Sequence, residues 1–553
     1  MTDISLPIPL TGTSPKEHVF PTLSQPQIER LASHGRVRQV RDGEVLIEAG
    51  DEIVPFFVVR AGQIEMIQPS GTQEKIVARH GPGQFTGEIN LLSGRRALMR
   101  ARVTKAGEVI ELSRETLLSI VQTDSELSEI LMRAFILRRA ELITQHVGDV
   151  VLVGSNHSAG TLRIKEFLTR NGYPYTYIDL DRGTDTQGFD AAEVPMVICR
   201  SKVTLKNPSN QEIADCLGFN AAIDPVHVRD LIIVGAGPSG LAAAVYGASE
   251  GLDVLVLEAN SPGGQAASSS KIENYLGFPT GISGQELAAA AYSQAEKFGA
   301  QVMIGRDAKH LACDRKPYTI QFDDGPGIPS RSVILATGAE YRKLSVDNLA
   351  QFEGVGIYYG ATFVESQMCS GEEVVVVGGG NAAGQAALFL AQTARHVLML
   401  VRSEGLAQSM SQYLIRRIEE NPAIDLRTRT EIVGLEGADH LQHVRIRNLR
   451  TGKITTHNIK HVFVMTGAVP STSWLESCLA LDANGFIKTG PDLTQEDLAA
   501  AHWPLVRPPH LLETSLPGVF AVGDVRSGSV KRVASAVGEG SIAVAFVHQV
   551  LHE

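Results

Sequence analysis

The sequence is poor in several features that would place it in a specialised class. Its 553 residues include only five scattered cysteines and no C-x-x-C pair. Acidic residues outnumber basic ones by 61 to 50, and the net charge of −11 argues against a nucleic-acid partner, because phosphate neutralisation needs a basic face. No apolar run approaches the length of a membrane span, and the first residues show no basic-then-apolar signal pattern.

These absences predict a cytoplasmic protein with free thiols and no membrane partner. The sixteen histidines do not pair with one another or with cysteines at ligand spacing, so we expect no metal site. The hydrophobic fraction of 43 % and the charged fraction of 20 % are ordinary for a globular protein.

The length predicts several domains. We expect four regions, named here and below as the roll (residues 1–148), the thioredoxin-like module (149–225), the first dinucleotide fold (226–342 with 468–553) and the second dinucleotide fold (343–467). The predicted fold class is multidomain α/β, with a β-roll and helices, a thioredoxin-like α/β domain, and two nested Rossmann-like folds.

The roll is predicted from short alternating strands with glycine turns, followed by "FTGEINLLSGRRALMRARV". Exposed backbone N–H groups beside an arginine form an anion site, and a nearby carboxylate can accept from a ribose hydroxyl. This stretch resembles the phosphate cassette of cyclic-nucleotide-binding domains. The resemblance implies that Glu88 takes the ribose 2′-OH of cAMP or cGMP, and that Gly87, Arg96 and Ala97 hold the phosphate.

Two details accompany the cassette. Leu98 stands where that family usually has a small residue, so a roll that has lost its ligand remains an alternative. Downstream, Thr123 and Glu126 have the spacing of a capping box and predict the start of a long helix.

The thioredoxin-like module reads as a βαβ unit, then a strand around Pro195 and a closing helix. It resembles glutaredoxins and thioredoxins, with Pro195 at the position of their cis-proline. The active-site position is "SNHS", Ser155 to Ser158, and a serine hydroxyl cannot replace a thiolate in disulfide exchange. We therefore expect a redox-silent module that serves for docking.

Two glycine motifs follow, each between a strand and a helix. Gly235, Gly237 and Gly240 form a G-x-G-x-x-G, and Glu258 ends the next strand, where it can accept from a ribose hydroxyl. The second motif places Gly378, Gly380 and Ala383 after four valines. Its second strand leads to Arg402 and Ser403 without an acid, which favours NADPH over NADH.

The last 328 or so residues resemble small bacterial thioredoxin reductases, with several motifs in the same order. The resemblance implies an FAD site formed by Gly235, Gly237, Pro238, Ser239, Gly240, Glu258, Gly264, Gln265, Asn274, Thr337, Gly338, Gly523, Asp524, Arg532 and Val533. It implies an NADPH site formed by Gly378, Gly380, Asn381, Ala382, Ala383, Arg402 and Ser403.

The chain departs from that family at its redox centre. The C-x-x-C would fall on "GATF", residues 360–363, which contains no sulfur, and the usual Arg-Gln pair beside the flavin reads Lys531-Arg532. We therefore expect an NADPH-dependent FAD oxidoreductase with no dithiol relay, an unknown electron acceptor and, by resemblance, a homodimeric assembly. The alternative is a cyclic-nucleotide or redox sensor with little turnover. Ordinary thioredoxin reductase activity would need a dithiol that the sequence does not contain.

Overall fold

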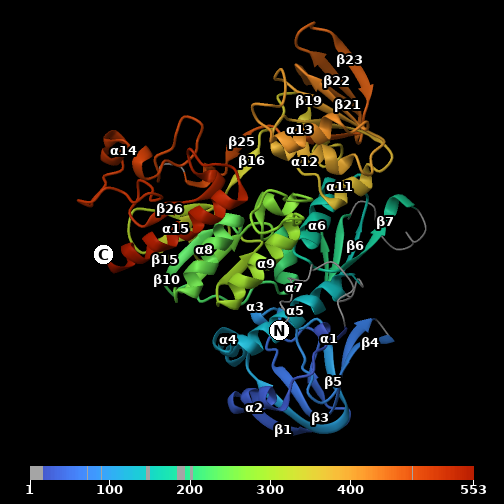
Figure 1. Ribbon diagram of the computed structural model, residues 1–553, viewed down its shortest axis with the longest axis vertical. Helices are drawn as coiled ribbons and strands as arrows, with labels where there is room; N and C mark the ends of the chain where they lie inside the picture. The colour runs from blue at the N-terminus through green and yellow to red at the C-terminus, as the bar shows by residue number, and fades with distance from the viewer. Residues whose placement is uncertain are drawn as a thin grey trace.

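The computed structural model describes residues 16–70, 73–88, 90–144, 150–182, 194–199, 203–475 and 478–553. Figure 1 shows the roll at one end of the molecule and the second dinucleotide fold at the other, with the first dinucleotide fold and the thioredoxin-like module side by side between them.

The roll is an antiparallel sheet in the order β1-β5-β3-β4, with β2 also on β5. Its strands are β1 (Arg36–Val40), β2 (Val45–Ile47), β3 (Phe56–Ser70), β4 (Gln73–His80) and β5 (Arg100–Leu112). Its helices are α1 (Lys16–Val19), α2 (Gln25–His34), α3 (Asn90–Ser93), α4 (Arg114–Thr123) and α5 (Ser125–Thr144). Three buried phenylalanines, Phe56, Phe85 and Phe135, pack against one another and hold α5 on the sheet.

The predicted capping box at the start of α5 is wrong. Asp124 caps this helix, because its Oδ1 accepts from the Leu127 backbone N–H at 3.0 Å. Thr123 still belongs to the last turn of α4 and donates its hydroxyl to the Ser119 carbonyl. Glu126 turns away and forms an ion pair with Arg30 at 2.5 Å.

The thioredoxin-like module has the sheet order β7-β6-β8-β9. Its elements are β6 (Val150–Gly154), α6 (Ala159–Arg170), β7 (Tyr175–Asp179), η1 (Leu180–Arg182), β8 (Met196–Cys199), β9 (Val203–Lys206) and α7 (Asn210–Leu217). Strand β6 is parallel to β7 and antiparallel to β8, and the peptide bond before Pro195 is cis, as the resemblance implied.

The first dinucleotide fold is built on the order β12-β11-β10-β15-β14-β13, with β26 on β15. Its strands are β10 (Arg229–Val234), β11 (Val254–Glu258), β12 (Gln301–Ile304), β13 (His310–Ala312), β14 (Tyr318–Gln321), β15 (Ile328–Leu335) and β26 (Val519–Ala521). Its helices are α8 (Pro238–Ser249), η3 (Gly264–Ser268), α9 (Gly284–Lys297), η4 (Ser473–Leu475), η5 (Gly490–Asp492), α14 (Gln495–Ala500), η6 (Gly523–Val525) and α15 (Val533–His552).

Helix α15 is the one helix in the described part of the chain that is long and apolar enough to cross a membrane. Its Gly540 lies against the Ser239 carbonyl of α8, and Ala543, Val544 and Val547 belong to the buried cluster of the first dinucleotide fold. These residues of α15 therefore form part of the core of the first dinucleotide fold.

The second dinucleotide fold has a parallel sheet in the order β17-β24-β18-β19-β20 and a three-stranded meander, β21-β22-β23. Its strands are β17 (Ile357–Tyr358), β18 (Glu373–Val377), β19 (His396–Val401), β20 (Ile424–Thr428), β21 (Thr430–Gly437), β22 (Leu441–Asn448), β23 (Ile454–Asn458) and β24 (His461–Val464). Its helices are α10 (Leu349–Phe352), α11 (Phe363–Met368), α12 (Asn381–Leu390) and α13 (Gln412–Glu419).

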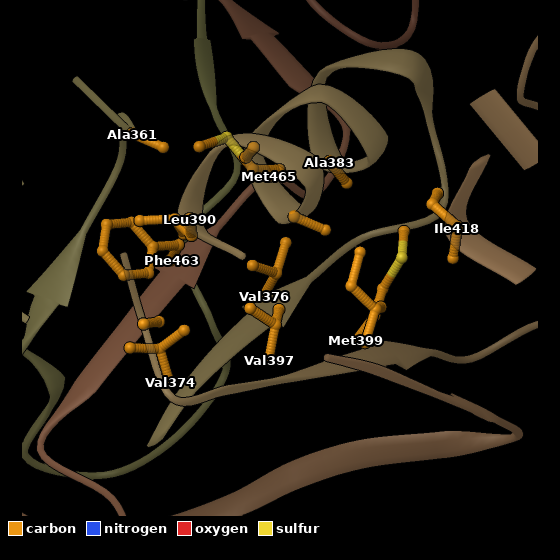
Figure 2. Packing of buried hydrophobic residues seen from close by; sticks show 14 of the residues in the cluster. Ala361, Val374, Val376, Ala383, Leu390, Val397, Met399, Ile418, Phe463 and Met465 are labelled. Atoms are coloured by element: carbon orange, nitrogen blue, oxygen red, sulfur yellow. The ribbon is translucent and has the colours of Figure 1, made fainter. Parts of the chain in front are cut away.

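Alternate valines of β18 face α12, so Val374 and Val376 pack with Ala383, Leu390 and Phe463 (Figure 2). Two short antiparallel strands, β16 (Ala339–Tyr341) and β25 (Ala468–Pro470), connect this fold to the first one.

The expectation that all five thiols are free is wrong. Cys313 and Cys478 form a disulfide across 165 residues of sequence, because the segment after η4 returns to the edge strand β13. The other three cysteines remain thiols.

Candidate functional site

The first glycine loop leaves room for a phosphate only on its outer side. Gly235 has a φ of 103°, and a Cβ there would overlap the Ala336 carbonyl, while a Cβ on Gly240 would overlap the Gly235 carbonyl. A Cβ on Gly237, the N-cap of α8, would meet nothing nearer than Gly264 Cα at 4.0 Å. Backbone N–H groups at a helix N-terminus therefore border a space that a pyrophosphate fits.

Glu258 lies beside this loop, as the sequence predicts. Its Oε2 accepts from the Ala236 backbone N–H at 2.8 Å, and its Oε1 accepts from the backbone N–H groups of Asn260 and Ser261. Burial raises the pKa of this carboxyl. Glu258 thus ties the glycine loop to the end of β11.

The other predicted FAD residues converge on that edge to different degrees. The Thr337 hydroxyl donates to the Ser471 carbonyl at 3.0 Å, the Gln265 side chain donates to the Ala339 carbonyl, and Gly338 has open space where a side chain would be. Asn274 is exposed, and no side-chain hydrogen bond holds it within the described residues.

Asp524 follows Gly523 in η6, three residues after the end of β26. Burial raises the pKa of Asp524, and the Lys531 ammonium donates to its backbone carbonyl at 3.1 Å. Arg532 is exposed and precedes Val533, the first residue of α15. The glycine loop after β10, the two acids Glu258 and Asp524, and the N-terminus of α15 together fit an extended dinucleotide such as FAD.

The second glycine loop repeats this construction. Gly378 has a φ of 143° at the end of β18, Gly380 is the N-cap of α12, and Ala382 and Ala383 follow within the helix. Asn381 accepts from the Ser411 backbone N–H at 2.8 Å, which ties the helix start to the next loop. The open N-terminus of α12 can therefore receive a second pyrophosphate.

The expected 2′-phosphate site also contains Arg429, which the sequence analysis did not predict there. Arg402 is exposed after β19, and within the described part of the chain no ion pair engages it. The Ser403 carbonyl accepts from the Arg429 backbone N–H at 3.0 Å, and the Arg429 side chain pairs with Glu404. The parallel pairing of β19 with β20 brings Arg429 here, and nothing in the local sequence around Arg402 could indicate it.

The position of the absent cysteine pair is a helix start. Thr362 caps α11, and Glu365 accepts from the Thr362 backbone N–H at 2.7 Å. The nearest cysteine in sequence, Cys369, is fully buried, and burial raises the pKa of its thiol to about 12. This thiol is therefore no substitute for a redox cysteine.

The disulfide is also badly placed for contact with the flavin. Cys313 follows Ala312, which pairs through Thr319 with Pro329, so it lies level with Ser330 of β15. The carboxyl end of β15 is five residues further on, which corresponds to about 16 Å of strand. The disulfide thus tethers the edge of the fold and is remote from the edge where the glycine loop lies.

The roll contains a cavity of about 820 Å³, its open mouth included, which is lined by Gly87, Glu88, Arg96, Ala97 and Leu98 among others. Arg138 of α5 borders it and donates to the carbonyls of Val19, Phe85 and Gly87 at 2.9, 3.0 and 2.8 Å. Burial lowers the pKa of Arg138 to about 9. The structure thus brings all four predicted cyclic-nucleotide residues to one cavity.

The cassette is engaged both by another residue of the roll and by the thioredoxin-like module. Arg96 pairs with Glu52 at 2.7 Å, and its side chain crosses Gly218 of the thioredoxin-like module, where a Cβ would lie 2.6 Å from Arg96 Cδ. Leu98 packs against the buried cluster of that module. The larger residue at this position is therefore part of a domain interface.

Arg95 makes the most deeply buried contact between the cassette and its neighbouring domains. The sequence pattern did not indicate a role for this residue. It is buried, lies 4.8 Å from the centre of the Phe219 ring, and donates to the Tyr292 hydroxyl of α9 at 2.8 Å. Burial raises the pKa of the neighbouring Glu296 to about 7, against the opposing charge of Arg95. The cassette thus reaches both the module and the first dinucleotide fold.

Over the described ranges, no group of three or more histidine, cysteine or acidic side chains is arranged to hold a metal ion.

Comparison with known proteins agrees with this geometry. Residues 229–540 match the pyridine nucleotide-disulphide oxidoreductase family model, and residues 37–124 match the cyclic nucleotide-binding domain model. The chain is 32 % identical to Bacillus subtilis thioredoxin reductase over 330 residues, which cover 59 % of this chain and 96 % of that one. It is also 32 % identical to the NADPH-dependent thioredoxin reductase 3 of Arabidopsis thaliana over 323 residues, 57 % of each chain.

Solved structures give the same result. Lactococcus lactis thioredoxin reductase in its FR conformation superposes with a TM-score of 0.52 at 27 % identity, covering 59 % of this chain and all of that one. The thioredoxin reductase of T. acidophilum gives the same TM-score at 27 % identity, covering 59 % of this chain and 99 % of that one. The relatives are flavoproteins that use FAD and NADPH. The chain belongs to the pyridine nucleotide-disulphide oxidoreductase family, as a thioredoxin reductase-like oxidoreductase fused to a cyclic nucleotide-binding domain.

Proposed function

We propose that this protein is an NADPH-dependent FAD oxidoreductase that passes electrons from flavin to an acceptor without an internal dithiol. The observation that carries this proposal is the contrast between two complete glycine loops and a sulfur-free position at residues 360–363. When bound, FAD would accept a hydride from NADPH and release electrons to a second substrate.

The chain's own residues would hold both dinucleotides. The N-termini of α8 and α12 would bind the two pyrophosphates, and Glu258 and Asp524 would accept from hydroxyls of the FAD ribose and ribitol. Arg402, with Arg429 beside it, would meet the 2′-phosphate of NADPH. Lys531 and Arg532 would place positive charge beside the flavin ring, which favours its anionic reduced form.

We further propose that cAMP or cGMP binds in the roll and modulates this activity. Glu88, Arg96 and the backbone around Gly87 border the cavity, and the cassette contacts both neighbouring domains through Arg95 and Leu98. A ligand changes activity only through its different affinity for two arrangements, commonly about 1–3 kcal/mol, so we expect modulation of turnover and no on–off switch.

A second candidate is a sensor with little turnover, and the covered position of the absent cysteines favours it, because Leu162 of the module belongs to the same buried cluster as Ala361. Steady-state NADPH oxidation with a panel of quinone, dye, metal-complex and disulfide acceptors separates the two functions. Turnover with one acceptor class supports the oxidoreductase. Flavin that is reduced by NADPH but reoxidised by none of them supports the sensor. A homodimer through the first dinucleotide fold and a cytoplasmic location remain predictions.

A further inference from the structure

Helix α6 of the thioredoxin-like module touches both dinucleotide folds. In Figure 1 it lies between α11 and the segment around α9. Its last residues, Arg170 and the C-cap Asn171, face the first fold, and its middle, from Leu162 to Glu166, faces the second.

At the first fold, α6 contacts the segment that the resemblance to thioredoxin reductases assigns to FAD. Arg170 Nη2 donates to the Gly264 carbonyl at 2.7 Å, and Asn171 Nδ2 donates to the Asn260 carbonyl at 3.1 Å. In return, Gln285 of α9 donates to the Thr169 carbonyl at 3.2 Å. Because the C=O and N–H of a trans peptide point in opposite directions, the bond to the Gly264 carbonyl fixes the direction of the Gln265 N–H.

At the second fold, α6 covers the position where the cysteine pair would be. Leu162 is 7 % exposed and lies in the buried cluster that contains Ala361. Glu166 neighbours Glu365, which is 1 % exposed at the start of α11, and burial, with this second carboxyl beside it, raises the pKa of Glu166 to about 9. A proton on one of the two carboxyls allows them to lie side by side.

Further contacts extend this second interface. Ala159, the first residue of α6, lies against Gly354, where an added Cβ would be 2.8 Å from Ala159 Cβ. The ring of His157 lies 5.3 Å from that of His440, between β21 and β22. Any rotation about β16 and β25 must break these contacts, since α6 remains attached to the first fold.

We propose that α6 is a strut that fixes the FAD segment and the second dinucleotide fold in one mutual arrangement. In it, Arg170 is a positioning residue for the FAD segment, and the Glu166–Glu365 contact is the joint to the second fold. The role of Arg170 rests on the proposed function for the identity of its cofactor, whereas the joint does not. The strut also closes the path by which a protein acceptor would reach residues 360–363.

The positioning role of Arg170 is tested by the rate at which the full-length holoprotein releases FAD, which is monitored by flavin fluorescence. Arg170→Ala should accelerate release about tenfold, and Arg170→Lys, which keeps a donor, should restore most of the difference. The matched control is Arg163→Ala on the same helix, because the hydrogen bonds that Arg163 donates among the described residues, to Asn210 and Pro208, stay within the module. Equal release rates for Arg170→Ala and Arg163→Ala would overturn the positioning role, while wild-type protein without FAD would overturn the proposed function instead.

The joint is tested by backbone hydrogen exchange in α11, which needs no flavin. Glu166→Ala should raise exchange at residues 363–368 several-fold, and Glu166→Gln, which keeps a hydrogen-bond donor, should leave it near the wild-type rate. Lys165→Ala is the control, since Lys165 donates to Asn156 within the module. Equal hydrogen-exchange rates in α11 for the Glu166→Ala and Lys165→Ala proteins would show that Glu166 does not hold α11.

Discussion

Two of the proposed phosphate sites, the glycine loop after β10 and the cassette of the roll, are built from different groups. The glycine loop uses backbone N–H groups whose directions are set by a helix and by neighbouring carbonyls. The cassette relies on Arg96, a long side chain that Glu52 and Gly218 already engage. A backbone site is therefore determined by its own segment, whereas a side-chain site depends on the domain beside it.

The largest expected effect comes from filling the backbone site. Gly240→Ala places a Cβ onto the Gly235 carbonyl, so purified protein should carry little or no FAD and should lose about 1–3 kcal/mol of stability. Flavin absorbance per mole of protein and chemical denaturation measure the two effects. Gly538→Ala is the control, because this α15 glycine has no atom within 4 Å of an added Cβ. Full FAD content in Gly240→Ala would show that the loop does not bind the pyrophosphate.

The side chains at the second loop should contribute less. Arg402→Ala should raise the KM for NADPH far more than that for NADH, because a lost charge-assisted bond to phosphate costs about 1.5–3 kcal/mol, or roughly tenfold to a hundredfold. Arg429→Ala should act in the same direction but more weakly, since Arg429 is shared with Glu404. Steady-state kinetics with both cofactors decides this, and equal changes for NADPH and NADH would remove both arginines from the 2′-phosphate site.

The contact between α6 and α11, which includes Glu166 and Glu365, should weaken as the pH rises. Burial, and then the hydrogen bond and charge of Glu365, raise the pKa of Glu166 from 4.5 to about 9, with Arg170 opposing. A raised carboxyl pKa stabilises the docked state fully below about 4.5, and this contribution is lost progressively up to about 9. Near Glu365, burial raises the pKa of both Tyr358 and Cys369, so neither titrates in this range.

The measurement is hydrogen exchange in α11 across this range, corrected for the intrinsic pH dependence of exchange. Wild-type protection should fall as pH rises, and Glu166→Gln should flatten the profile. Identical profiles for the two proteins would contradict the assignment of this titration to Glu166.

The smallest expected effect concerns the cassette. Glu52 is largely exposed, so its ion pair with Arg96 is worth at most about 1 kcal/mol. Glu52→Gln should therefore strengthen cAMP or cGMP binding by no more than about fivefold, and Arg96→Ala should abolish it. Calorimetry on both variants and on wild type tests this. Binding that Arg96→Ala leaves unchanged would mean that the phosphate lies elsewhere in the cavity.

The contrast between features set within one segment and features that depend on a distant one explains what the sequence could predict. The glycine loops follow from local patterns, because adjacent residues determine them, and the resemblance to thioredoxins implied the cis peptide at Pro195. The Cys313–Cys478 disulfide joins residues 165 apart, and the approach of Arg429 to Ser403 depends on strand pairing. Leu98, which the sequence marks only as a departure, is explained by the module that packs against it.

The central claim, that electrons leave the flavin without a dithiol relay, is tested most directly by anaerobic titration of the full-length protein with NADPH. One equivalent of NADPH per FAD should reduce the flavin completely, and three thiols should be counted in the denatured protein both before and after the titration. A requirement for two equivalents per FAD, with the thiol count rising from three to five, would show that the Cys313–Cys478 disulfide accepts electrons and would contradict the account.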